Sequence, residues 1–480
     1  METLHPGLYS QEVSGTPPME GVSTSTGAFV GIAPKGEIGK AVLVTSWTQY
    51  VAEFGGYIAD SYLAYAVQGF FKNGGKRCYI SRVVHYDGNN VTSKKSKLDI
   101  KVAPDSEDVL AIVSAKNDGV WGDSISVAIT PNDAKFSLVV SYEGNVVETY
   151  DNLDLDTAEE YIKSSKYISL DIIGDTPLPK VVDTKLTGGD DGVKDITPVD
   201  FVGDETKGTG LHAFDSVKIN LLAVPGMTSA DILKEIIAYV ELRQDCFAIL
   251  DTPKGQTPQE VDEYVTKTAN LASEYAGVYY PWIQVNDPIG VGKNPKKFLP
   301  PSGYVMGAFA KMDTEVGVWR APAGTDSQLL GVIDLEYSVS DNEQDILNPD
   351  CINCIRAFTG DGIIIWGART LSKGEYKYIP VRRVMMFVRQ SLLANLRWTV
   401  FRPNDSVLWN ATTNTVFNFL SSFWSQGGLK GSSPKEAFFV VCDDTINTAD
   451  TVDEGKMFVD IGICPRKPAE FVIFRLSLTR

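Results

Sequence analysis

Apolar positions along most of the chain follow two alternating spacings, one extended and one helical. Residues 25–33 place apolar side chains between glycines and predict a strand, whereas residues 60–71 repeat apolar side chains every three or four positions and predict a helix. A second strand is expected at residues 76–84, after a glycine turn. The same alternation of strands and helices returns at residues 217–282. This order predicts a parallel sheet flanked by helices.

Residues 85–209 interrupt that order with short β-branched runs separated by Gly, Asn and Asp turns, which predicts a mostly β insertion. At 480 residues the chain is too long for one typical core. We expect a multidomain protein of α/β and α+β class, in which an α/β core carries the insertion and precedes a C-terminal α+β domain. The expected parts are an N-terminal arm at 1–24, the core at 25–84 and 210–354, the insertion at 85–209, the C-terminal domain at 355–468 and a C-terminal strand arm at 469–480.

Residues 376–405 form a basic amphipathic stretch within an acidic chain. Apolar side chains recur there at helical spacing. The stretch up to residue 404 contains six basic side chains and no acid, although the whole chain carries a formal charge of −17. At about 100° per residue, Arg382, Arg389 and Arg397 fall in one sector beside the apolar face. Two interpretations stay open: a solvated helix face, or a docking site for an acidic surface.

Both ends of the chain have the pattern of extended segments. Leu8 and Val13 are the apolar residues of a short N-terminal arm, and residues 470–478 alternate apolar and polar side chains close to the last residue. A terminal strand with one apolar face exposes an edge that can pair with another chain. The arms therefore either pair within their own chain or add strands to the sheet of a neighbouring copy.

Composition narrows the class of function. The sequence pI of about 4.7 argues against binding to nucleic acid or to anionic lipid. No apolar run is long enough for a transmembrane helix, and the first residues lack the pattern of a secretory signal. Six scattered cysteines suit synthesis in a reducing cytoplasm.

An α/β chain invites a search for catalytic motifs, and no phosphate loop, zinc-protease motif or nucleophile elbow occurs. Cys351 and Cys354 form a lone CxxC without further zinc ligands, which leaves a redox pair or two structural thiols. Asp251 ends a predicted strand, where it either belongs to an enzymatic site or caps the next segment. No catalytic residue, metal ligand or cofactor is predicted, and an α/β enzyme with a site near Asp251 stays the alternative.

An ordered series of short motifs runs along both ends of the chain. The motifs near the N-terminus are Pro6-Gly7-Leu8-Tyr9, Ser25-Thr26-Gly27-Ala28-Phe29-Val30-Gly31 and Asn73-Gly74-Gly75. Those near the C-terminus are Val381-Arg382-Arg383, Phe401-x-Pro403-Asn404-Asp405, Leu408-Trp409, Gly428-Leu429-x-Gly431 and Pro468-Ala469-Glu470-Phe471-Val472. Each motif is short, but the ordered set is specific, and it resembles the tail sheath proteins of contractile phage tails and related contractile injection systems. Residues 85–209 contain none of them.

This resemblance implies a structural part rather than an enzyme. Sheath proteins of the family stack as sixfold rings around an inner tube, exchange terminal strands between subunits, and contract to drive the tube through a target envelope. The C-terminal domain lies innermost in the family, and large insertions decorate the outside. By this resemblance the strand arms comprise Leu8, Tyr9, Val13, Phe471, Ile473 and Phe474, and the tube-binding residues are Arg382, Arg383, Arg389 and Arg397.

The partners implied by the resemblance are other copies of the chain, the inner tube protein, the baseplate, the tail terminator and, where they exist, sheath paralogues. Neither nucleic acid nor membrane insertion is expected. Assembly in the bacterial cytoplasm is expected, as part of a tail particle that is released or docked at a membrane. A phage virion, a bacteriocin, a type VI apparatus and an extracellular injector all stay open. A surface-layer or adhesin subunit is a further alternative, against which the missing export signal counts.

Overall fold

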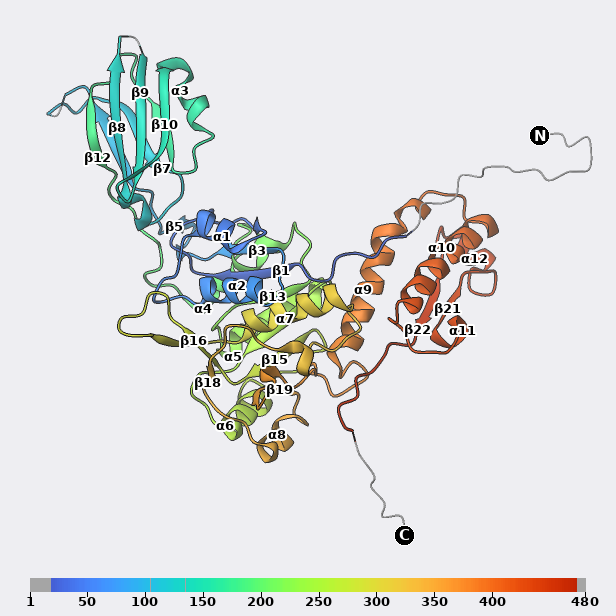
Figure 1. Ribbon diagram of the computed structural model, residues 1–480. Coiled ribbons are helices and arrows are strands. Elements are labelled where there is room, and N and C mark those ends of the chain that lie inside the picture. The colour runs from blue at the N-terminus through green and yellow to red at the C-terminus, as the bar shows by residue number, and fades with distance from the viewer. Residues whose placement is uncertain (1–18, 104, 134, 473–480) are drawn as a thin grey trace, which may run out of the picture. The chain divides into compact units, whose positions relative to one another are not determined.

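The computed structural model describes residues 19–103, 105–133 and 135–472 (Figure 1). The described chain forms two compact units. The larger unit comprises residues 24–316 and 321–379, and the smaller unit comprises residues 19–23, 317–320 and 380–472. The fold is mixed α/β with several sheets, as the sequence predicts.

An eight-stranded sheet forms the centre of the larger unit, in the order β2-β3-β1-β13-β14-β15-β19-β20. Six strands run parallel: β1 (Gly27–Gly31), β3 (Cys78–Arg82), β13 (Leu221–Ala223), β14 (Phe247–Asp251), β15 (Ala276–Tyr280) and β19 (Ile352–Phe358). The edge strands β2 (Val42–Val44) and β20 (Gly362–Ile365) pair antiparallel. All residues of β1, β14 and β15 are buried, as expected for a parallel sheet covered on both faces.

Helices cover the central sheet, and two of them meet through glycines. Gly303 and Gly69 lie at the contact of α2 and α7, where an added Cβ on Gly303 would come within 2.5 Å of the Cα of Ala66, and one on Gly69 within 2.3 Å of the Tyr304 ring. Glycine therefore permits the close approach of these helices. The helices of this unit are α1 (Trp47–Phe54), α2 (Leu63–Lys72), α4 (Pro198–Val202), α5 (Ala230–Arg243), α6 (Pro258–Glu263), α7 (Ser302–Glu315) and α8 (Asp341–Leu347), with shorter turns η2 (Gly210–Phe214), η3 (Tyr264–Thr268) and η4 (Thr325–Ser327).

A small antiparallel sheet is formed by residues between strands β15 and β19 of the central sheet. It consists of β16 (Ile283–Asn286), β17 (Lys296–Leu299) and β18 (Asp334–Leu335), with β16 in the middle. The sequence predicts a loop at residues 287–301 because Gly, Pro and Lys dominate there. The loop is confined to the hairpin tip, and the segment returns as strand β17 through pairing with β16.

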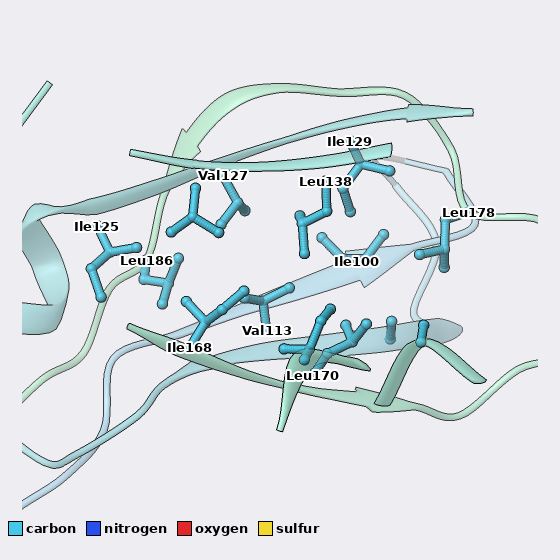
Figure 2. Packing of buried hydrophobic residues seen from close by; sticks show 14 of the residues in the cluster. Ile100, Val113, Ile125, Val127, Ile129, Leu138, Ile168, Leu170, Leu178 and Leu186 are labelled. Atoms are coloured by element: carbon cyan, nitrogen blue, oxygen red, sulfur yellow. The ribbon is translucent and has the colours of Figure 1, made fainter. Parts of the chain in front are cut away.

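The insertion is mostly β and has a hydrophobic core of its own. One sheet has the order β10-β9-β8-β12 and the other β11-β7-β6, and buried side chains of both sheets point toward each other (Figure 2). Helix α3 (Leu155–Ile162), which the turn-rich sequence pattern does not predict, contributes Ala158 and Ile162 to that core. The other elements are β4 (Tyr86–Asp87), β5 (Asn90–Val91), β6 (Lys97–Lys101), β7 (Val109–Ala115), η1 (Val120–Ser124), β8 (Ile125–Asn132), β9 (Lys135–Tyr142), β10 (Asn145–Asp154), β11 (Ile168–Ile172) and β12 (Val181–Lys185).

The insertion leaves and rejoins the core at neighbouring points. The amide of Lys94 donates to the carbonyl of Asp190, and the amide of Asp190 donates back to Lys94. Arg82 at the end of β3 is almost completely buried, and its Nη1 donates to the carbonyls of Gly36 at 3.0 Å and Asp118 at 2.8 Å. Burial lowers the pKa of the Arg82 guanidinium to about 10. One buried cation thus links the core to the turn between β7 and η1 of the insertion.

The smaller unit contains α9 (Ile379–Asn395), η5 (Arg397–Thr399), α10 (Ser406–Ser425), α11 (Pro434–Ala437), β21 (Phe438–Val441), α12 (Ala449–Asp453) and β22 (Asp460–Ile463). Its core includes Val384 and Val388 of α9 together with Val416, Leu420 and Leu429. The sequence assigns residues 355–379 to this C-terminal domain. The structure instead includes them in the larger unit, because β19 and β20 extend the central sheet.

Candidate interaction surfaces

Helix α9 has the apolar face that the sequence predicts. Val381, Val384 and Val388 are buried, while Leu392 and Leu396 pack partly buried against the core of the smaller unit. Phe387 also packs there and contacts the rings of Phe419 and Phe423. The helical spacing read from the sequence therefore corresponds to real packing along the whole helix.

The four candidate arginines of this region fall into two groups. Arg389 and Arg397 are exposed. Arg382 and Arg383 are only 7% and 4% exposed. Both of them, and Arg389 as well, have interaction partners within the chain. The expectation that Arg382 and Arg383 face outward fails because residues 381–384 are all buried, so no side of α9 is open to solvent at this turn. Periodicity locates an apolar face, but it does not reveal that the opposite face is also covered.

The turn after α9 and the first turn of α10 present exposed apolar side chains. We call the patch formed by Val400, Phe401 and Val407 the turn patch; all three side chains are exposed, and Phe401 is completely so. Phe401 has a φ of 65°, a conformation that costs about 1–3 kcal/mol for a residue with a Cβ. Backbone bonds from Val400 to Arg397 and from Arg402 to Thr399 hold the turn.

Polar side chains on the far side of this turn fix its exit. The Asp405 carboxylate accepts hydrogen bonds from the amides of Val407 and Leu408, both at 3.0 Å, and so caps α10. Asn404 accepts from Nε1 of Trp409 at 2.8 Å and donates to the carbonyl of Lys456 at 2.8 Å. These bonds explain the Asn-Asp part of the Phe-x-Pro-Asn-Asp motif. They leave the fully exposed Phe401 without a structural role, and the sequence pattern predicts none for it.

An extended segment at residues 19–23 lies along α9. The amide of Glu20 donates to Asn395 Oδ1 at 3.3 Å, and Asn395 Nδ2 donates to the carbonyl of Glu20 at 2.8 Å. One turn earlier on the helix, the amide of Val22 donates to Ser391 Oγ at 3.2 Å. Gly21 fits against the ring of Phe387, where an added Cβ would come within 2.7 Å. The segment therefore runs antiparallel to α9, and its earlier residues point toward the end of the helix.

The hairpin of β21 and β22 is the candidate acceptor for strand addition. Phe438 pairs with Ile463 and Val441 with Asp460 in a sheet that has two strands among the described residues. Phe438 is buried, whereas Phe439 on the other face is exposed. A two-stranded sheet is marginal in isolation and gains stability from additional strands.

The predicted arm residues lie mostly outside the described part of the chain. Leu8, Tyr9, Val13, Ile473 and Phe474 are not among the described residues. Phe471 and Val472 are described, are exposed, and are not part of a strand. The roles assigned to these residues stay predictions.

Asp251 sits at the carboxyl end of β14, where the sequence placed a carboxylate. It is 2% exposed and accepts hydrogen bonds from the amide and Oγ of Ser302, at 2.9 and 2.7 Å, and from the amide of Gly226 at 3.2 Å. Burial raises its pKa to about 6. Asp251 therefore caps the start of α7, a helix 51 residues away, rather than the segment that follows it.

Cys351 and Cys354 do not form a reactive pair. Both are free thiols and buried. Burial raises the pKa of Cys351, and it raises the pKa of Cys354 to about 12. A reactive thiol requires a lowered pKa, so these two cysteines behave as structural thiols. Among the residues that the structure describes, no group of three or more His, Cys, Asp or Glu could hold a metal ion. None of the described helices has both the length and the apolar character needed to cross a membrane.

Two family models match consecutive parts of the chain. Residues 201–371 match the family described as phage tail sheath protein central domain, and residues 372–479 match the phage tail sheath C-terminal domain.

Related sequences are tail sheath proteins. The tail sheath protein of Enterobacteria phage T4 is 23% identical over 274 residues, which are 52% of this chain and 40% of that protein. The putative prophage major tail sheath protein of Pseudomonas aeruginosa (strain UCBPP-PA14) is 25% identical over 264 residues, which are 54% of this chain and 64% of that protein. The matches thus span less than two thirds of either relative.

Solved structures with the same fold cover nearly the whole chain. The helical sheath of the anti-feeding prophage in its contracted state has a TM-score of 0.63 at 22% identity, with 99% of both chains covered. The sheath complex of the extracellular contractile injection system PVC, also contracted, has a TM-score of 0.60 at 22% identity and covers 99% of this chain and 98% of that one. A sheath tail protein from Listeria innocua has a TM-score of 0.64 at 13% identity and covers 93% of this chain and 96% of that one. At these identities the likeness establishes the fold.

Proposed function

The chain belongs to the contractile tail sheath family, and we propose that it is a structural subunit of the contractile sheath around the inner tube of a phage-tail-like injection system. The observation that carries this proposal is the pair of sheath domain matches, which together run from residue 201 to residue 479. The fold similarity to sheaths of injection particles over 99% of the chain supports it. The family consists of structural proteins.

In the proposed assembly, copies of the chain stack as sixfold helical rings and contract to drive the tube through a target envelope. Terminal arms, including Leu8, Tyr9 and Val13 at one end and Phe471, Ile473 and Phe474 at the other, add strands to neighbouring subunits. The exposed edges of the β21–β22 hairpin are suitable acceptors. Such strands hold through backbone hydrogen bonds, so the polymer stays connected while its rings rotate.

The tube-facing contact is proposed for the exposed arginines Arg389 and Arg397. Exposed ion pairs contribute about 0–1 kcal/mol each, which suits a contact that must release during contraction. The baseplate is a further proposed partner, because a similar chain occurs in a baseplate structure of the anti-feeding prophage. The tail terminator and sheath paralogues complete the proposed set, and assembly is proposed to take place in the bacterial cytoplasm.

Truncation tests the proposal. Removing the residues from Phe471 onward should yield folded monomers that form no tubular polymers in negative-stain microscopy, because one connecting strand is lost. The full-length chain, expressed in parallel, provides the control and should form tubes. Tubes of normal length from the truncated chain would contradict the connector role. Images of the full particle, with or without a capsid, distinguish a phage virion from a capsid-less injector.

A further inference from the structure

We propose that, in the unassembled subunit, residues 1–18 fold back on their own chain and cover the turn patch of Val400, Phe401 and Val407. The inference rests on the proposed function, in which the same N-terminal residues connect neighbouring subunits. It adds a place where the arm is held before assembly.

The turn patch has the character of a binding surface. Val400 and Phe401, whose ring is completely exposed, project from a turn that is held by its own backbone hydrogen bonds, and Val407 is exposed in the first turn of α10. Phe401 adopts a positive φ there. Rigid, exposed aromatic side chains are typical anchors of binding surfaces, and strained backbone persists mainly where it has a function.

The N-terminal segment leads toward this patch. Val22 is bound to Ser391 and Glu20 to Asn395, so the chain approaches the end of α9 as it nears residue 19. Phe401 follows Asn395 by only a few residues, whereas a segment of 18 residues can extend over about 60 Å. The arm is therefore joined to the chain near the end of α9 from which the turn follows, and it is long enough to reach the turn patch.

The arm and the patch are complementary in charge and apolarity. Residues 1–18 contain Glu2 and Glu12, no lysine or arginine, and the apolar side chains of Leu4, Leu8, Tyr9 and Val13. Arg397 and Arg402 flank Phe401, and both are exposed. Asp405, the nearest acid along the sequence, accepts hydrogen bonds from the amides of Val407 and Leu408. An acidic, partly apolar segment fits this surface.

The C-terminal arm fits the turn patch less well than the N-terminal arm does. Residues 473–480 contain Arg475 and Arg480 and no acid, so they would meet Arg397 and Arg402 with like charge. The N-terminal arm is therefore the occupant that the charges favour. Covering Phe401 would keep free subunits from associating through the turn patch, and assembly would exchange this contact for one with a neighbouring subunit.

Photo-crosslinking of the full-length protein tests the inference. Phe401 is replaced by p-benzoyl-phenylalanine, an aromatic residue at a fully exposed position, and the dilute monomer is irradiated. Digestion at glutamate then separates the arm into fragments that end at Glu2, Glu12 and Glu20. We expect a crosslink within one chain to residues 1–18. A crosslink between two chains, or none at all, would overturn the proposal.

The same photoreactive residue at Leu242 is the matched control. Leu242 is a highly exposed side chain on α5 in the larger unit. It should give no crosslink to the arm, and an equal yield from both positions would count against a specific contact.

Dye binding provides an independent readout. Deleting residues 1–15 should increase the fluorescence of a dye that binds apolar surface several-fold, and Phe401→Asn in the shortened chain should reverse the increase. Asparagine tolerates a positive φ, so this variant keeps the turn. Unchanged fluorescence after the deletion would overturn the inference.

The outcomes separate this inference from the proposed function. If the arm does not crosslink to its own chain but tubes still require it, the storage site is wrong and the sheath function stands. If the intrachain crosslink forms but the arms are dispensable for tubes, the storage site stands and the proposed connector role of the arms is wrong.

Discussion

The carboxylate of Asp251 serves the fold, not catalysis. Its two oxygens receive hydrogen bonds from Ser302 and Gly226, so the end of β14, the start of α7 and the loop after β13 are joined at one buried point. Desolvation disfavours the ionised form, and the hydrogen bonds only partly offset that effect. A buried group of this kind makes stability depend on pH.

We predict that stability falls with rising pH through Asp251. The pKa is about 6 in the folded chain, above its ordinary value of 3.8, so the folded state binds the proton more tightly. The protonated Asp251 side chain contributes its full stabilisation below the pKa that Asp251 has in the unfolded chain. This contribution is lost as the pH rises through about 6. Between pH 5 and 7.5, above the isoelectric point, the free energy of unfolding of the native chain should fall by about 1 kcal/mol relative to Asp251→Asn.

Urea unfolding of both proteins at several pH values measures this difference. Other titrating groups are common to the two proteins and cancel in the comparison. A difference that stays constant from pH 5 to 7.5 would show that Asp251 does not titrate as its burial implies.

Helix α9 combines two environments along its length. Its first turns are buried on all sides, whereas Arg389 and the following Arg397 are exposed beside an apolar face that packs on the core. Only the later part of this element can therefore offer charge to a partner without unfolding. Arg382, Arg383 and Arg389 all have partners inside the chain, and burial identifies the first two as part of its packing.

We predict that the double substitution Arg389→Glu and Arg397→Glu lowers the amount of sheath recovered with inner tubes several-fold. Charge reversal replaces two weak attractions with repulsions, if the tube surface is acidic. Self-assembly of sheath without tubes should not change. Co-sedimentation with purified tubes measures both quantities.

The control carries the same change in net charge elsewhere. Lys185→Glu and Lys194→Glu alter two exposed lysines of the insertion region and its return segment. This control should leave recovery on tubes unchanged. Equal recovery for all three proteins would mean that Arg389 and Arg397 do not contact the tube.

The whole molecule is built of parts with separate cores. Among its described residues, the insertion has a cluster of nineteen buried hydrophobic side chains, and its ends meet through paired backbone hydrogen bonds between Lys94 and Asp190. A part with its own core and adjacent ends can fold alone.

We therefore predict that residues 92–192, expressed alone, unfold cooperatively and protect the amides of β7, β8 and β9 from hydrogen exchange. Val127→Asp, at a fully buried position, should abolish folding because it buries an unpaired charge. Val182→Asp, at an exposed position, should change the free energy of unfolding by no more than about 0.5 kcal/mol. A fragment that is unfolded without the core would refute the modular interpretation.

Local sequence patterns predict several features of the molecule correctly. The strands at residues 25–33 and 76–84 and the apolar face of α9 follow from local periodicity, and each is present. The burial of residues 381–383 and the cap partner of Asp251 could not be predicted in the same way. Both depend on segments far away in sequence, about which a local pattern contains no information.

The sequence alone determined the α/β class, the mostly β insertion and the family, because spacing and ordered motifs are properties of the chain itself. Tertiary structure alone decided which arginines are buried, which helix Asp251 caps, and where residues 19–23 lie. It also showed that Phe401 is exposed in the turn after α9, the helix to which Glu20 is hydrogen-bonded. Burial and neighbourhood arise only when distant segments pack, and they decide which charged and apolar side chains remain available to a partner.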